Sequence, residues 1–135
     1  MDEADRKEYL REVERKGSTI GASLPERIRI GDEELQLDEF LIETRKVDRV
    51  SEQSNEIIAD AKRVLRAERD DRVEALETES LTHEQAQSLL EEINGLDRAL
   101  NALETIRRPN YGAESRNARI DDHKKWLDFL DDIRR

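Results

Sequence analysis

The chain has 135 residues, and its 34 acidic and 24 basic side chains give a net charge of −10 at pH 7. This length suits one domain, residues 1–135, whose core needs no covalent staple. The absence of cysteine excludes disulfides, thiolate metal sites and cysteine nucleophiles. The acidic balance makes nucleic acid an unfavourable partner, because phosphate groups repel acidic surfaces.

The N-terminus and the hydropathy pattern predict a cytoplasmic protein with no membrane segment. The chain opens with Met1-Asp2-Glu3-Ala4-Asp5, which has neither the basic nor the apolar region of a secretion signal. No stretch approaches the ~18 apolar residues that cross a bilayer. Of the 24 cations, 18 are arginine and 6 are lysine. An acid-rich, lysine-poor chain favours a halophilic protein over an ordinary acidic one.

A β-hairpin is predicted near the start of the chain, at about residues 27–37. It follows a short helix over residues 2–16 that ends at Gly17. Apolar residues alternate on both sides of a four-residue turn at 31–34, so we expect them to share one face. The facing pairs would be Ile30 with Leu35 and Ile28 with Leu37. An isolated hairpin is marginally stable, so this face should lie on helices.

Two helices are predicted next. Asp38 is expected to cap a helix over residues 38–50, and a longer helix begins at Ser51 or Ser54. The apolar stripe of the longer helix consists of Ile57, Ile58, Ala61, Val64 and Leu65. Glu68 and Arg72 then interrupt this stripe as an i,i+4 pair in the favourable order. Either they form a solvated rim, or Glu68 is an acidic partner of the last helix.

The helix from His83 to about Arg107 has the clearest signals. Thr82 and Gln85 form a capping box at its start. The sequence Asn94-Gly95 is a stop signal, but the apolar pattern passes through it in phase, so we expect one continuous helix. The apolar residues are Leu89, Ile93, Leu96, Leu100 and Leu103. This helix and the one beginning near Ser51 should form a long central hairpin.

The last helix, from Glu114 or Ser115 to Ile133, carries an anomaly. Its apolar half contains Ile120, Trp126, Leu127, Phe129, Leu130 and Ile133. Arg116, Arg119 and His123 fall in that same half. Buried cations need acidic neighbours or a bound anion. A base-stacking platform is one interpretation of Trp126 and Phe129, but their place on the apolar arc favours packing.

The candidate site is the segment from Arg107 to Arg119, whose charge balance is +3. Its proposed anion-binding residues are Arg107, Arg108, Tyr111, Arg116, Arg119 and His123. Arginine holds phosphate or carboxylate with two donors, and a helix N-terminus near Ser115 favours an anion. The ligand would be a nucleotide, a phosphorylated metabolite or RNA phosphate. The alternative is that these cations pair with Asp and Glu of other helices or of a second subunit.

No motif specifies a reaction, a metal or a cofactor, and we expect none of the three. His83 and His123 lie in different predicted helices without the HExxH spacing of a zinc site. Adjacent acidic pairs such as Asp70-Asp71 diverge by about 100° on a helix and do not converge on one ion. Catalysis would gain support if His123 and Glu68 approached each other across a cleft.

The chain resembles a family of small acidic haloarchaeal proteins of unknown function. The resemblance rests on Leu24-Pro25-Glu26-Arg27-Ile28, on Asp97-Arg98-Ala99-Leu100-Asn101-Ala102-Leu103, on Tyr111-Gly112 and on Trp126-Leu127-Asp128-Phe129-Leu130. These are packing and turn residues, so the resemblance implies a halophilic cytoplasm and no assigned activity.

Together these observations predict a mainly α fold, an antiparallel bundle of four to five helices with one small β-hairpin. The narrow leucine pattern and the scarcity of aromatic residues favour a homodimer. We expect a non-enzymatic structural or protein-interaction module with an exposed apolar patch of several hundred Å². The alternative is the anion-binding module built on residues 107–119.

Overall fold

The computed structural model describes residues 2–14, 24–47, 50, 52–106 and 124–134. Within them the chain forms α1 (Glu3–Glu14), β1 (Arg27–Ile30), β2 (Glu33–Gln36), α2 (Leu37–Arg45), α3 (Glu52–Thr78), α4 (His83–Glu104) and α5 (Lys124–Arg134). The prediction of a mainly helical fold with one small hairpin is confirmed.

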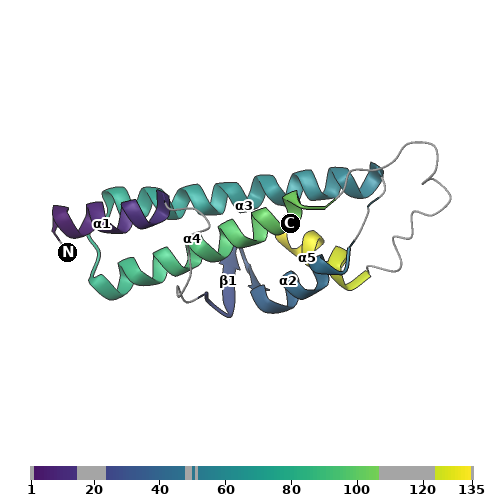
Figure 1. Cartoon of the computed structure of the whole chain (residues 1–135), viewed down its shortest axis with the longest axis horizontal. Coiled ribbons are helices and arrows are strands. Elements are labelled where there is room, and N and C mark those ends of the chain that lie inside the picture. The colour runs from purple at the N-terminus through teal and green to yellow at the C-terminus, as the bar shows by residue number, and fades with distance from the viewer. Residues whose placement is uncertain (1, 15–23, 48–49, 51, 107–123, 135) are drawn as a thin grey trace.

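The helices α3 and α4 lie side by side as the long central pair, as predicted (Figure 1). Helix α1 packs on both of them at the end where the N-terminus lies. The hairpin, α2 and α5 pack against the other half of the pair. The elements therefore form an elongated arrangement around the α3–α4 axis.

Helix α4 begins and continues as its sequence predicts. The Thr82 hydroxyl accepts from the Gln85 backbone N–H, and the Gln85 side chain accepts from the Thr82 N–H. The helix passes through Gly95, which is buried. A Cβ placed there would lie 2.7 Å from Cδ1 of Ile28 and 3.1 Å from Cδ2 of Leu37. Glycine at this position lets the hairpin pack directly on the helix backbone.

The predicted hairpin register is wrong by two residues. The strands pair Ile28 with Leu35 and Ile30 with Glu33, which leaves a turn of two residues rather than four. The physical reason lies in Gly31, whose φ of +60° suits the first position of a tight hairpin turn. The shared apolar face survives, since Ile28, Ile30, Leu35 and Leu37 are all buried.

Helix α2 differs from its prediction at both ends. It begins at Leu37 rather than after Asp38, and its N-cap residue Gln36 makes no side-chain capping bond. The Leu37 N–H instead donates to the Glu26 carbonyl, at 3.0 Å, so the hairpin supplies a partner that a capping side chain would otherwise provide. The helix ends at Arg45, five residues before the predicted end.

Helix α3 begins at Glu52, and Ser54 lies buried within it rather than at its cap. Its predicted stripe faces the core, with Ile58, Ala61 and Leu65 buried. Ser51, the other predicted start, lies outside the described residues.

The buried residues form two apolar clusters along the α3–α4 pair. The larger cluster joins the hairpin, α2 and α5 to α3 and α4, and the smaller joins α1 to the far ends of the same two helices. Along α3 the first cluster reaches Leu65 and the second begins at Val73. The interval between them contains Glu68, Arg69 and Arg72, so the interrupted stripe marks a polar layer.

Candidate functional site

Of the predicted site residues, the described part of the chain contains Glu68 alone. The anion-binding candidates Arg107, Arg108, Tyr111, Arg116, Arg119 and His123 all lie outside the described residues. The prediction that they cluster around an anion therefore stays a prediction, as does their pairing with Glu68.

Glu68 holds the turn of the hairpin against α3. Its Oε1 accepts from the Gly31 backbone N–H at 3.0 Å, and its Oε2 accepts from Nη1 of Arg72 at 2.9 Å. The Glu68 side chain is 23% exposed and that of Arg72 is 12% exposed. A solvated rim is therefore the wrong interpretation of this pair.

Arg72 is the centre of the polar layer. Besides Glu68, its guanidinium donates to Oε1 of Glu92 on α4 at 3.0 Å and to the Arg29 carbonyl on β1 at 2.7 Å. A neighbouring bond joins Nε of Arg69 to Oδ1 of Asp97 at 2.5 Å. Five charged side chains thus join α3, α4 and the hairpin. Their role in the structure is to stabilise the packing of these elements.

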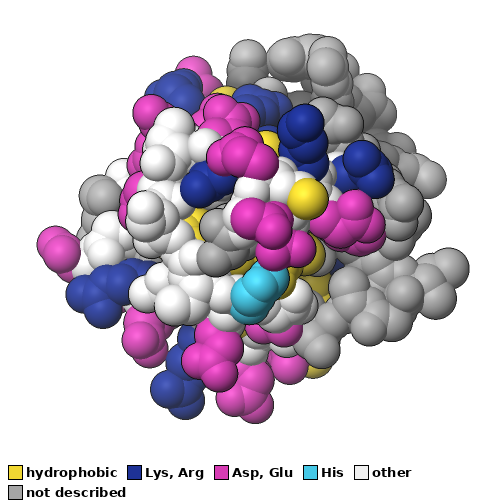
Figure 2. All heavy atoms as spheres, turned by 90° about the vertical axis from the view of Figure 1, so that its left-hand side faces the viewer, with side chains coloured by type: hydrophobic (Ala, Val, Ile, Leu, Met, Phe, Trp, Pro, Cys, Tyr) yellow, Lys and Arg dark blue, Asp and Glu magenta, His cyan; other side chains and the backbone are white. Residues whose placement is uncertain are grey.

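A second polar group fixes α1 to the far end of the α3–α4 pair. Arg6 donates to the Leu76 carbonyl and, at 2.8 Å, to the Glu79 carbonyl at the end of α3. Nε2 of His83 lies 3.4 Å from Oδ2 of Asp5, and its Nδ1 lies 3.5 Å from the Tyr9 hydroxyl. The His83 side chain is 62% exposed, whereas that of Arg6 is 14% exposed. Figure 2 shows charged groups of both signs interspersed on this end of the molecule.

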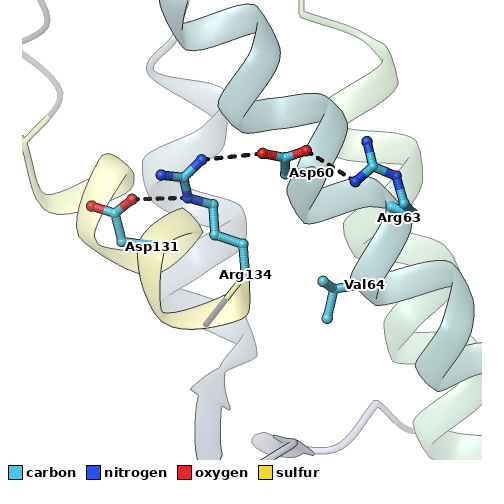
Figure 3. Close-up of a pocket in the computed structure, with 5 residues that line it drawn as sticks. All are labelled: Asp60, Arg63, Val64, Asp131 and Arg134. Carbon is cyan, nitrogen blue, oxygen red and sulfur yellow. Dashed lines mark hydrogen bonds and ion pairs between the residues drawn. The ribbon is translucent and has the colours of Figure 1, made fainter.

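A cleft between α3 and α5 brings together residues that the sequence analysis did not single out. It has a volume of about 660 Å³ and is lined by Asp60, Arg63, Val64, Asp131 and Arg134 (Figure 3). Arg134 of α5 reaches across to Asp60 of α3, at 3.3 Å, and also pairs with Asp131 at 3.3 Å. Asp60 in turn pairs with Arg63 at 3.1 Å.

Some of the ion pairs at this cleft could be predicted from the sequence. Asp60 with Arg63 and Asp131 with Arg134 are both i,i+3 pairs, which helix spacing would reveal. The bond between Arg134 and Asp60 joins residues 74 positions apart, and no spacing rule reaches that far.

The described surface offers charge rather than an apolar patch. Among the described residues, Ile42 is the large hydrophobic side chain with high exposure, at 51%. The predicted apolar patch is thus not found on this part of the chain. Trp126 is buried and Phe129 packs edge-on against Phe40, so the packing interpretation of the two aromatic residues is confirmed.

The described residues contain neither a metal-binding cluster nor a membrane-spanning helix. No cluster of three or more His, Asp or Glu side chains there is placed to hold a metal ion. No helix there is long and apolar enough to cross a membrane.

The fold and the cleft define a small helical-bundle protein with a hairpin on one side and a charged cleft beside its last helix. The chain belongs to a family of unknown function, DUF5788, whose model matches residues 1–131. No curated protein and no solved structure matches the chain. The match agrees with the expected family of unknown function and adds no activity, while the haloarchaeal origin of that family stays a prediction.

Proposed function

We propose that this protein is a non-enzymatic interaction module of a halophile cytoplasm that binds a protein partner through charged contacts. The observation that carries the proposal is the α3–α5 cleft, an open hollow edged by two acidic and two basic side chains. Charged residues on a surface select partners by complementary charge and contribute specificity more than raw affinity.

The burial pattern supports a charged contact surface over an apolar one. The large apolar side chains of α5 pack in the core, since Trp126, Leu130 and Ile133 are all fully buried. The polar layer around Arg72 is likewise occupied in holding the hairpin. The cleft residues remain on the surface, where a partner can reach them.

Copurification tests this function. Tagged chain would be used to capture proteins from an extract of its own cells in molar salt, beside the variant Arg63→Asp. We expect the unaltered chain to capture a partner reproducibly, and the variant to capture much less of it. The matched control Arg11→Asp changes an equally charged, exposed residue on α1 and should retain the partner. If the unaltered chain captures no protein reproducibly, the proposal is refuted.

The second candidate is an anion-binding or regulatory module that uses Arg107, Arg108, Arg116 and Arg119. One observation favours it: both oxygens of Glu68, the proposed acidic partner, already accept hydrogen bonds from Gly31 and Arg72. Glu68 is therefore not a free counter-charge for these arginines, and a phosphate would supply one.

Titration with inorganic phosphate and with ATP, followed by calorimetry, tests this candidate. The double variant Arg116→Ala/Arg119→Ala should lose binding and keep its circular dichroism spectrum. Loss of stability with no change in anion binding would instead assign these arginines to internal ion pairs.

A further inference from the structure

The four charged residues of the cleft form a line of alternating sign. In order they are Asp131, Arg134, Asp60 and Arg63, joined by contacts of 3.3, 3.3 and 3.1 Å (Figure 3). We call these four residues the charge ladder. Its two inner members each contact two opposite charges, whereas each end member has one such contact among these residues.

The ladder is complementary to itself when it is turned end for end. The order of signs is minus, plus, minus, plus, so an antiparallel copy presents plus, minus, plus, minus. A two-fold axis through the middle of the ladder would set Asp131 against Arg63 of a second copy, and Arg134 against Asp60. An isologous dimer requires this property of a surface, because the same patch is used on both subunits.

We propose that the α3–α5 cleft is the contact surface of a homodimer, with the charge ladders of two copies paired antiparallel. The ends of the ladder are its most exposed members, Arg63 at 74% and Asp131 at 50%, against 41% for Asp60 and 35% for Arg134. New contacts thus form where the charges are least satisfied within one chain.

The shape of the cleft fits this pairing. Arg63 is a long side chain at one end of the ladder, and the hollow of about 660 Å³ beside it has room for a guanidinium. In the dimer, Arg63 of each copy would enter the cleft of the other and approach Asp131 there. The half-buried Val64 lines the same cleft and would contact the aliphatic stem of the arginine.

The net charge sets the conditions under which the dimer forms. Each chain carries a charge of −10, so two copies repel at long range in dilute salt. At about 1 M salt the screening length falls to roughly 3 Å, which removes the long-range repulsion, whereas ion pairs enclosed between two subunits are screened much less than exposed ones. Association should therefore strengthen as salt is added.

The inference rests on the proposed interaction role and names the partner as a second copy. Two charge reversals test it by sedimentation equilibrium in 1 M salt. Arg63→Asp and Asp131→Arg each place like charges at both ends of the paired ladders, so each variant alone should associate at least about tenfold more weakly than the unaltered chain. Both residues are exposed, so the folds should survive, which circular dichroism checks.

The decisive sample is an equimolar mixture of the two variants. In the mixed dimer, Asp at position 63 faces Arg at position 131, and the original Arg63 and Asp131 face each other at the other end. The mixture should recover the association of the unaltered chain. A matched control pair, Arg11→Asp and Glu8→Arg on α1, should dimerise normally, alone and mixed.

An unaltered chain that stays monomeric, or two variants that dimerise normally, would overturn the inference. Variants that weaken association without recovery in the mixture would also overturn it, because ladder pairing predicts that recovery. The proposed function would still stand after any of these results if the chain captured a different protein in the copurification experiment.

Discussion

The indole N–H of Trp126 on α5 donates to Oγ1 of Thr44 on α2, at 3.1 Å, across 82 positions of sequence. The Thr44 hydroxyl donates in turn to the Phe40 carbonyl, at 2.7 Å, and both side chains are buried. This bond specifies how α5 docks, because apolar contacts alone would tolerate a shifted helix. The position of α5 determines where Asp131 and Arg134 lie in the charge ladder.

Replacement of Thr44 tests that docking. Thr44→Val removes the hydroxyl that accepts from Trp126, and we expect the free energy of unfolding to fall by about 1 kcal/mol. Trp126 is the single tryptophan, so its fluorescence follows urea unfolding directly. Thr78→Val is the matched control, since Thr78 makes the same i−4 bond, to the Glu74 carbonyl, on an exposed surface. Equal effects of the two changes would contradict the role assigned to Thr44.

Gly95→Ala should destabilise the protein, although alanine is the better helix former. The intrinsic gain is about 1 kcal/mol, and overpacking a core costs about 1–3 kcal/mol. The added Cβ meets Ile28 at 2.7 Å, and Ile28 has no exposed surface into which it could move. We expect a net loss of about 1 kcal/mol in urea unfolding. The exposed Ser88→Ala on the same helix should be neutral or slightly stabilising; a gain at Gly95 as well would contradict the packing described.

Arg72→Ala should be among the most damaging changes to a charged residue. It leaves Glu68 and Glu92 close together without their shared cation, and we expect a loss of about 2–3 kcal/mol, less than for a fully buried pair. Arg66→Ala removes the more exposed pair with Glu104 and should cost less than about 0.5 kcal/mol. Urea unfolding measures both, and similar losses would show that the polar layer adds nothing beyond an ordinary surface pair.

Acid should loosen the start of α1. The pKa of Asp2 lies below its ordinary value, chiefly because its carboxylate accepts a hydrogen bond from the Asp5 backbone N–H, at 2.9 Å. The charged form therefore stabilises the fold fully above the ordinary carboxyl pKa of about 3.9, and this contribution is lost as the pH falls through the lowered value. The Asp5 amide resonance should shift in that range by NMR. The same titration in Asp2→Ala should show a smaller shift, because the acceptor of the Asp5 N–H is gone, and an identical shift would remove Asp2 as a cause.

Much of the helical fold could be predicted because its signals are local. The capping box at Thr82 and the phase of the apolar residues through Gly95 needed no knowledge of tertiary structure. The hairpin register could not be fixed in this way. A shift of two residues leaves every side chain on the same face, so both registers bury the same four apolar residues. The choice depended on the turn conformation at Gly31.

The candidate site was less predictable than the fold. Acidic residues are so numerous that the sequence could not indicate which of them would meet Arg72 or Arg134, and both cations found partners on other helices. The interruption of the apolar stripe at Glu68 does indicate a structural feature, since it marks the polar layer between the two apolar clusters. The arginines sought as its partners lie outside the described residues, and the contacts seen are to Gly31 and Arg72.

Sedimentation equilibrium of the unaltered chain at several salt concentrations asks whether two copies pair through the α3–α5 cleft. We expect a mass of twice 15.8 kDa in 1 M salt, with weaker association in dilute salt, where the two charges of −10 repel. A mass of 15.8 kDa at every salt and protein concentration would contradict it.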